Sequence, residues 1–93
     1  LASQSPAVVD TLGWILVREG ETEEGLKLLY TANEAAPTIG DIAYHLAFAL
    51  DKTGKKQEAV AVLEGALNNA SGDVAFDQEK DLAAALLAKL KAN

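Results

Sequence analysis

Residues 12–20 read LGWILVREG, and residues 46–54, which lie 34 positions later, read LAFALDKTG. Apolar, small and turn residues recur together at this offset, which chance slippage of the chain against itself does not produce. The same offset also pairs identical residues outside this stretch: Glu24 with Glu58, Leu29 with Leu63, Ala32 with Ala66 and Ala36 with Ala70. The sequence therefore contains an internal repeat, and a period of this length is typical of stacked helical units.

Each unit is predicted to hold two helices joined at a glycine. Ser5 and Pro6 form a start signal, because serine caps a helix and proline suits its first position. Gly20 ends the first helix, since glycine can take the positive φ found there. Thr38 and Asp41 predict a capping box at the start of the second unit. The apolar spacing of three and four predicts helices over residues 6–19, 23–36, 38–54, 57–69 and 76–91.

The composition fits an all-helical domain. Of 93 residues, 49% are hydrophobic and 24% are charged, which is too apolar for a disordered segment. No apolar run approaches the roughly 20 residues that span a membrane. The net charge of −6 argues against nucleic-acid binding, which needs a basic surface. The chain has no cysteine, hence no disulfide framework, and no methionine even at position 1, so we expect it to be part of a longer protein.

A 34-residue helix-turn-helix unit with these residues resembles the tetratricopeptide repeat (TPR). The first unit carries the family pattern at Val9, Leu12, Gly13, Leu16, Gly20, Gly25, Leu29, Ala32 and Pro37. The second carries it at Ala43, Leu46, Ala47, Leu50, Gly54, Ala59, Leu63 and Ala66, and departs from it at Ser71, where the family has proline. The resemblance divides the chain into the end of a preceding unit or a linker, two repeats and a C-terminal capping helix, over residues 1–5, 6–39, 40–73 and 74–93.

The resemblance implies an all-α, right-handed solenoid of two helical pairs with a terminal cap. Leu12 and Leu46 are expected to fill the seams between neighbouring pairs. Val8 and Val9 are expected to lie uncovered at the open edge of the first repeat. The last helix is expected to cover the second repeat with its leucines, while its first residues face water, namely Gln78, Glu79, Lys80 and Asp81.

A shorter resemblance concerns residues 9–16, which read VDTLGWIL. This stretch is similar to the last repeats of large bacterial TPR proteins, some of which belong to exosortase-linked envelope and exopolysaccharide systems. The resemblance is compatible with the cytoplasm and with the bacterial envelope or periplasm, and the sequence does not choose between these locations.

Patterns for catalysis and metal binding are missing from the sequence. The 7 glycines are scattered and form no phosphate-binding loop. His45 is the only histidine, and without a second one we expect it to be packed or solvated on its helix rather than to bind a metal. No serine has a base placed beside it by the sequence. We therefore expect no enzyme activity, no cofactor and no metal site.

One set of residues remains as a candidate binding site. In TPR proteins the first helix of each pair lines a concave groove, which implies a peptide-binding surface here. An aromatic floor with acidic residues at its rim suits an apolar or basic segment. Alternatively, Trp14 and Phe48 pack against the neighbouring helix pair. The implied groove residues are Asp10, Trp14, Val17, Arg18, Asp41, Tyr44, Phe48, Asp51 and Lys52.

The leading hypothesis is a non-catalytic module that binds a protein or peptide segment in this groove, as part of a larger TPR scaffold. Two alternatives stay open. The chain could be the structural capping end of a longer solenoid whose binding surface lies elsewhere, or it could self-associate through the open edge of its first repeat.

Overall fold

The computed structural model describes residues 4–69 and 72–92, and these residues contain helices but no strand. The all-α prediction is therefore confirmed. The predicted leading segment, residues 1–5, and the turn at Ser71 lie largely outside the described residues. The helices are α1 (Pro6–Arg18), α2 (Thr22–Ala35), α3 (Gly40–Lys52), α4 (Lys56–Leu67) and α5 (Lys80–Ala92).

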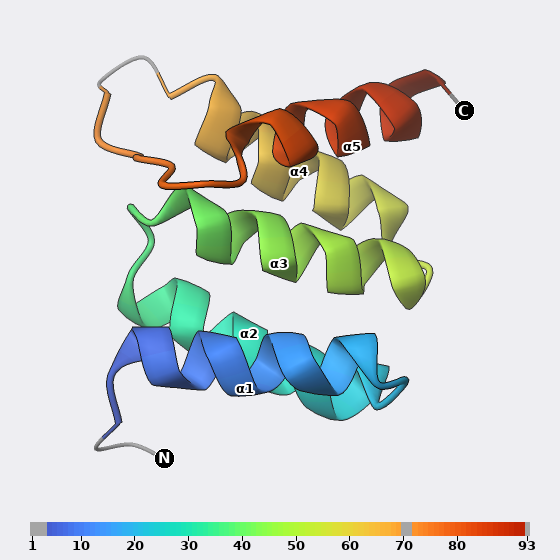
Figure 1. The fold of residues 1–93 in the computed structure, drawn as a ribbon. Coiled ribbons are helices and arrows are strands. Elements are labelled where there is room, and N and C mark those ends of the chain that lie inside the picture. Colours follow the sequence, from blue (N-terminus) through green and yellow to red (C-terminus); the bar gives the residue numbers. More distant parts are fainter. Residues whose placement is uncertain (1–3, 70–71, 93) are drawn as a thin grey trace.

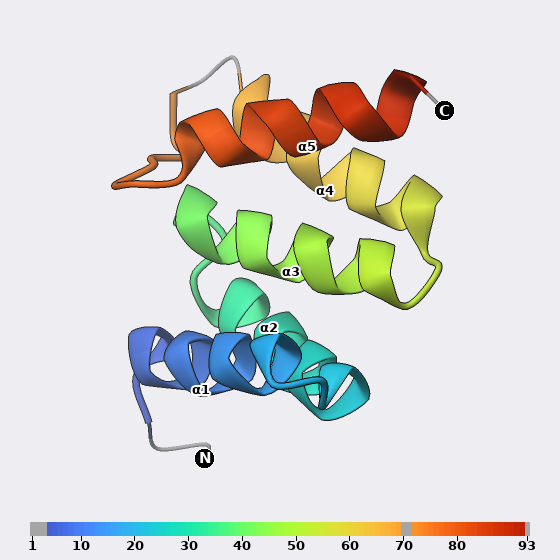
Figure 2. The same cartoon turned by 45° about the vertical axis from the view of Figure 1, so that its right-hand side comes forward.

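Consecutive helices lie side by side through the whole molecule. In Figures 1 and 2, α1 and α2 form one end, α3 lies in the middle, and α4 and α5 form the other end. Helix α2 packs on both α1 and α3, and α4 packs on both α3 and α5. Within the described residues, no helix is both long and apolar enough to cross a membrane.

Local sequence signals account for the helix boundaries. The hydroxyl of Ser5 accepts a hydrogen bond from the N–H of Val8 at 3.3 Å, and Pro6 is the first residue of α1, as predicted. Gly20 and Gly54 follow α1 and α3 with φ of 94° and 82°, a conformation that glycine adopts without strain. Both ends of α3 lie 34 residues after those of α1, so the sequence period recurs in the helices.

Small residues allow the helices of each pair to approach closely. A Cβ atom on Gly25 of α2 would lie 2.6 Å from the carbonyl oxygen of Gly13 and from a methyl group of Val17, both on α1. In the second pair the equivalent positions are Ala47 and Ala59, and both are fully buried. These contacts hold α1 against α2 and α3 against α4, which places α1 and α3 on neighbouring layers.

The core lies between the two pairs and under α5. Its largest fully buried side chains are Leu29, Leu46, Leu50 and Leu63. Ala83 and Leu90 of α5 join the same cluster, so α5 packs on the second helical pair, although Leu82 of the same helix is 53% exposed.

Two expectations about the first repeat are wrong. Leu12 is 41% exposed whereas Leu46 is 1% exposed, because α2 covers α3 but no described element covers the outer face of α1. Val9 is buried rather than uncovered, since it packs in a small cluster with Ala32 and Ile42.

The start of the last helix also differs from the prediction. Helix α5 begins at Lys80 rather than Phe76, because residues 74–79, which we call the α5 lead-in, are held against the start of α3. The N–H of Ala75 donates to the carbonyl of Thr38 at 2.9 Å, and the N–H of Gly40 donates to that of Ala75 at 2.6 Å. The Phe76 ring occupies the space that a Cβ on Gly40 would need.

Candidate functional site

The nine predicted groove residues divide into a buried and an exposed set. Val17 and Tyr44 are 4% and 7% exposed and belong to the core cluster, so a ligand cannot reach them in this arrangement. Their burial follows from the packing of α1 and α2 on α3, which the sequence pattern did not resolve. The half-buried members are Asp10, Trp14, Asp41, Phe48 and Asp51, and the exposed ones are Arg18 and Lys52.

The three aromatic residues contact one another across α1 and α3. Trp14 meets Phe48 edge to face with ring centroids 5.1 Å apart, and its centroid is 6.0 Å from that of Tyr44. Such pairs stabilise a contact beyond the area they bury. Lys52 extends over the outer side of Phe48, with its ammonium 5.3 Å from the ring centroid. The aromatic residues thus join the two helical pairs, and only Trp14 and Phe48 keep a partly exposed edge.

His45 is the main feature that sequence reasoning missed. It is 7% exposed, and its two ring nitrogens contact two carboxylates from other parts of the chain. Nδ1 lies 2.8 Å from Asp10 of α1, and Nε2 lies 2.6 Å from Glu79 of the α5 lead-in. The contact between Nε2 and Glu79 is short but poorly aligned for a hydrogen bond. Neither Nε2 nor this Glu79 oxygen has another hydrogen-bond partner among the described residues.

The carboxylates change the protonation of His45. Burial by itself lowers the pKa of His45, but the hydrogen bond and charge of Asp10 and the charge of Glu79 outweigh it and raise the pKa above the usual 6.5. The same surroundings act on Tyr44, whose pKa is raised by burial and by the charge of Glu79. His45 therefore keeps its proton to a higher pH than a free imidazole does, and in the protonated form both nitrogens donate.

Glu79 corrects an expectation about the last helix. Its carboxylate turns inward to His45 instead of facing water with its neighbours. Both carboxylate partners of His45 lie more than 30 residues away in the sequence, so no local pattern could have indicated them. Both ring nitrogens are taken by carboxylates, and among the described residues no group of three potential ligands is arranged to hold a metal ion.

Asp41 has a different role from the one predicted. The first turn of α3 has no side-chain cap, so the capping box of Thr38 and Asp41 is absent. Instead the Asp41 carboxylate accepts hydrogen bonds of 3.2–3.3 Å from the backbone N–H groups of Asp77, Gln78 and Glu79. Hydrogen bonds to an ionised carboxylate are stronger than neutral ones. Asp41 thus fixes the α5 lead-in on the start of α3.

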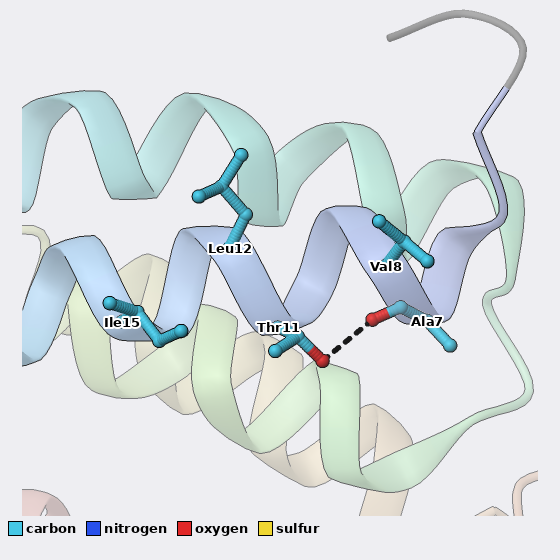
Figure 3. Close-up of a pocket in the computed structure, with 5 residues that line it drawn as sticks. All are labelled: Ala7, Val8, Thr11, Leu12 and Ile15. Atoms are coloured by element: carbon cyan, nitrogen blue, oxygen red, sulfur yellow. Dashed lines mark hydrogen bonds between the residues drawn. The ribbon is translucent and has the colours of Figure 1, made fainter.

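The clearest open surface of the molecule lies on α1. Figure 3 shows five side chains gathered on one side of this helix, and we call them the α1 face: Ala7, Val8, Thr11, Leu12 and Ile15. Val8 and Ile15 are 51% and 46% exposed. Even the polar member is turned onto its own helix, since the Thr11 hydroxyl donates to the carbonyl of Ala7 at 2.9 Å. The α1 face is therefore almost entirely apolar.

Comparison of the chain with protein-family models, with characterised proteins and with solved structures finds no match.

Proposed function

We propose that this chain is a non-catalytic protein-interaction module of the TPR type, and that the α1 face is its docking surface. One observation carries the proposal. Val8, Leu12 and Ile15 are exposed, whereas the residues one period later, Ile42, Leu46 and Ala49, are buried beneath a packed helix. The α1 face has the composition of a helix contact, but none of the described helices covers it.

The internal repeat indicates the chemistry of the occupant. Helix α2 covers α3, with Ala32 in the same cluster as Ile42, and α4 covers α5, with Leu63 in the same cluster as Leu90. Leucine and alanine thus recur three residues apart on both covering helices, at Leu29 and Ala32 and at Leu63 and Ala66. We therefore propose that the occupant is one amphipathic helix of a partner protein with such a leucine–alanine stripe.

The dimensions of the α1 face agree with a single helix. Helix α1 has 13 residues and is therefore about 20 Å long, the length of an equally short partner helix. A stable dimer of globular proteins needs about 800 Å² from each subunit, which is more than five side chains on one helix offer. This comparison favours a docked helix over a second copy of the chain.

The test uses a synthetic peptide of residues 21–36, because this segment carries α2 and covers the equivalent surface of α3. Titration of the peptide into the isotopically labelled chain is expected to shift the NMR signals of α1. Leu12→Glu should abolish these shifts, because a charge would be buried under the peptide. The matched control is Leu82→Glu, which alters a leucine that is 53% exposed on α5 and should leave binding unchanged.

Two results would contradict this assignment. If the Leu12→Glu variant and the unaltered chain bind the peptide equally, the α1 face is not the binding site. Sedimentation could also show a dimer that dissociates in the Leu12→Glu variant. This result would assign the α1 face to a second copy of this chain instead of a partner helix.

The groove between α1 and α3 is the second candidate surface. It is favoured by the partly exposed edges of Trp14 and Phe48 beside the exposed Arg18 and Lys52. Replacement of Phe48 by alanine should weaken the binding free energy of a peptide at this site by about 1–3 kcal/mol, as the truncation of an anchor residue does.

A further inference from the structure

We propose that His45 is a proton-dependent latch that holds the α5 lead-in, and with it α5, on the two helical pairs. The proposal concerns conformation and goes beyond the function of the α1 face. It rests on the position of one imidazole between carboxylates from two other elements, Asp10 on α1 and Glu79 immediately before α5.

The latch depends on the number of protons on the imidazole. An imidazolium has two N–H groups and can face both carboxylates, whereas a neutral imidazole has only one. After proton loss, a nitrogen lone pair must face one of the two carboxylate oxygens at less than 3 Å. The site is buried, so little water is present to screen that repulsion.

Glu79 is the carboxylate that we expect to leave. Asp10 belongs to α1, which α2 holds tightly, and its side chain is 13% exposed. The Glu79 side chain is 23% exposed and belongs to an irregular segment. Glu79 also immediately precedes the last helix, and its carbonyl accepts the N–H of Ala83 in the first turn of α5 at 2.9 Å. Movement of Glu79 therefore displaces the first turn of α5.

The groups that surround His45 supply no positive charge that could compensate for the loss of its proton. The carboxylates of Asp10 on α1 and of Glu79 in the lead-in face the ring. On α3 itself, the Tyr44 ring centroid lies 5.8 Å away and Asp41 lies one turn earlier, engaged by the lead-in N–H groups. Trp14 stacks on the imidazole at 4.2 Å and brings no formal charge. The raised pKa of His45 agrees with this acidic surrounding.

The sign of the effect follows from the direction of the pKa shift. A histidine whose pKa is raised by folding stabilises the folded form fully below its unfolded pKa of about 6.5. This stabilisation is lost as the pH rises through the higher pKa of the folded protein. The latch is therefore closed below about pH 6.5 and loosens as the pH rises through the raised pKa, exposing the apolar surface that Ala83 and Leu90 cover.

The experiment follows the single histidine and the last helix together. NMR signals of the His45 ring and hydrogen-exchange protection factors of α5 amides are measured from about pH 5 to about pH 9. Protection factors are corrected for intrinsic exchange, so they report only the opening of α5. We expect a His45 pKa above 6.5 and a fall in α5 protection over the same pH range, tenfold for each unit by which contact with Glu79 raises this pKa.

Two variants separate the latch from general destabilisation. Glu79→Gln removes one carboxylate and should lower the His45 pKa and flatten the pH dependence of α5 protection. The matched control is Glu64→Gln, because Glu64 also holds α5, through an ion pair with Lys91 at 2.9 Å, but does not contact His45. This control should lower protection equally at all pH values and leave the His45 pKa unchanged.

The proposal is overturned by either of two results in the unaltered chain. One is a His45 pKa at or below 6.5, and the other is α5 protection that stays constant while His45 titrates. Neither result depends on a variant that folds. A flat pH profile in Glu79→Gln together with a steep one in Glu64→Gln supports the latch.

Discussion

The indole of Trp14 lies on the imidazole of His45, with ring centroids 4.2 Å apart and ring planes inclined by 20°. These are the only tryptophan and the only histidine of the chain. The fluorescence of this indole can therefore report the protonation of His45.

We expect the fluorescence of Trp14 to rise as the pH rises through the pKa of His45. An imidazolium in contact with an indole quenches its emission more strongly than a neutral imidazole does. The measurement is a fluorescence titration with the His45→Gln variant as control, whose emission should be independent of pH in this range. Constant emission of the unaltered chain while the NMR signal of His45 titrates would show that the two rings are apart in solution.

Global stability should show the same pH dependence. The free energy of unfolding in urea is expected to fall as the pH rises from about 6.5, since the raised pKa of His45 means that the folded state binds the proton more tightly. The tyrosines do not interfere below pH 9. Burial and the charge of Glu79 raise the pKa of Tyr44, and burial with the hydrogen bond to Glu58 raises that of Tyr30 to about 12. A stability profile that rises over this range would contradict the prediction.

Leu12 and Leu46 should respond differently to truncation. Leu46→Ala is expected to cost about 2–5 kcal/mol of unfolding free energy, because it leaves a cavity in a fully buried site. Leu12→Ala should cost under about 1 kcal/mol, since the leucine is already 41% exposed. Urea unfolding of both variants measures the difference. Similar losses would mean that the α1 face is covered in solution.

Phe48→Ala tests whether the aromatic residues join the helical pairs. The ring meets Trp14 edge to face and is half-buried, so we expect a loss of about 2–3 kcal/mol, below the roughly 3–5 kcal/mol of a fully buried phenylalanine. Quenching of Trp14 by acrylamide should increase in the same variant. Unchanged stability would instead support a free aromatic floor in the groove.

Asp41→Asn should loosen the α5 lead-in without unfolding α3. The amide keeps the shape of the side chain but lacks the negative charge of the carboxylate, which accepts hydrogen bonds from three backbone N–H groups. We expect the free energy of unfolding to fall by about 1 kcal/mol. The NMR signals of residues 77–79 report the change directly. Asp51→Asn on the same helix is the control. Equal changes in the NMR signals of residues 77–79 in both variants would contradict a specific role of Asp41 in holding the lead-in.

The features that depend on local interactions could be predicted from the sequence. Pro6 after Ser5 started α1, Gly20 and Gly54 ended helices with positive φ, and the small residues of each pair allowed close packing. These signals act within one or two helical turns and recur with the repeat, so they could be read without the tertiary structure. The predicted helices agree with the observed ones except at the start of α5.

Long-range packing determines which of two equivalent residues is covered and which polar groups meet. Leu12 and Leu46 have the same place in the repeat, but Leu12 is 41% exposed whereas Leu46 is 1% exposed. Asp10, His45 and Glu79 lie on three elements and meet because the pairs stack and the lead-in is hydrogen-bonded to the start of α3. Burial and charge contacts of this kind depend on distance in space, which neither helix period nor residue type encodes.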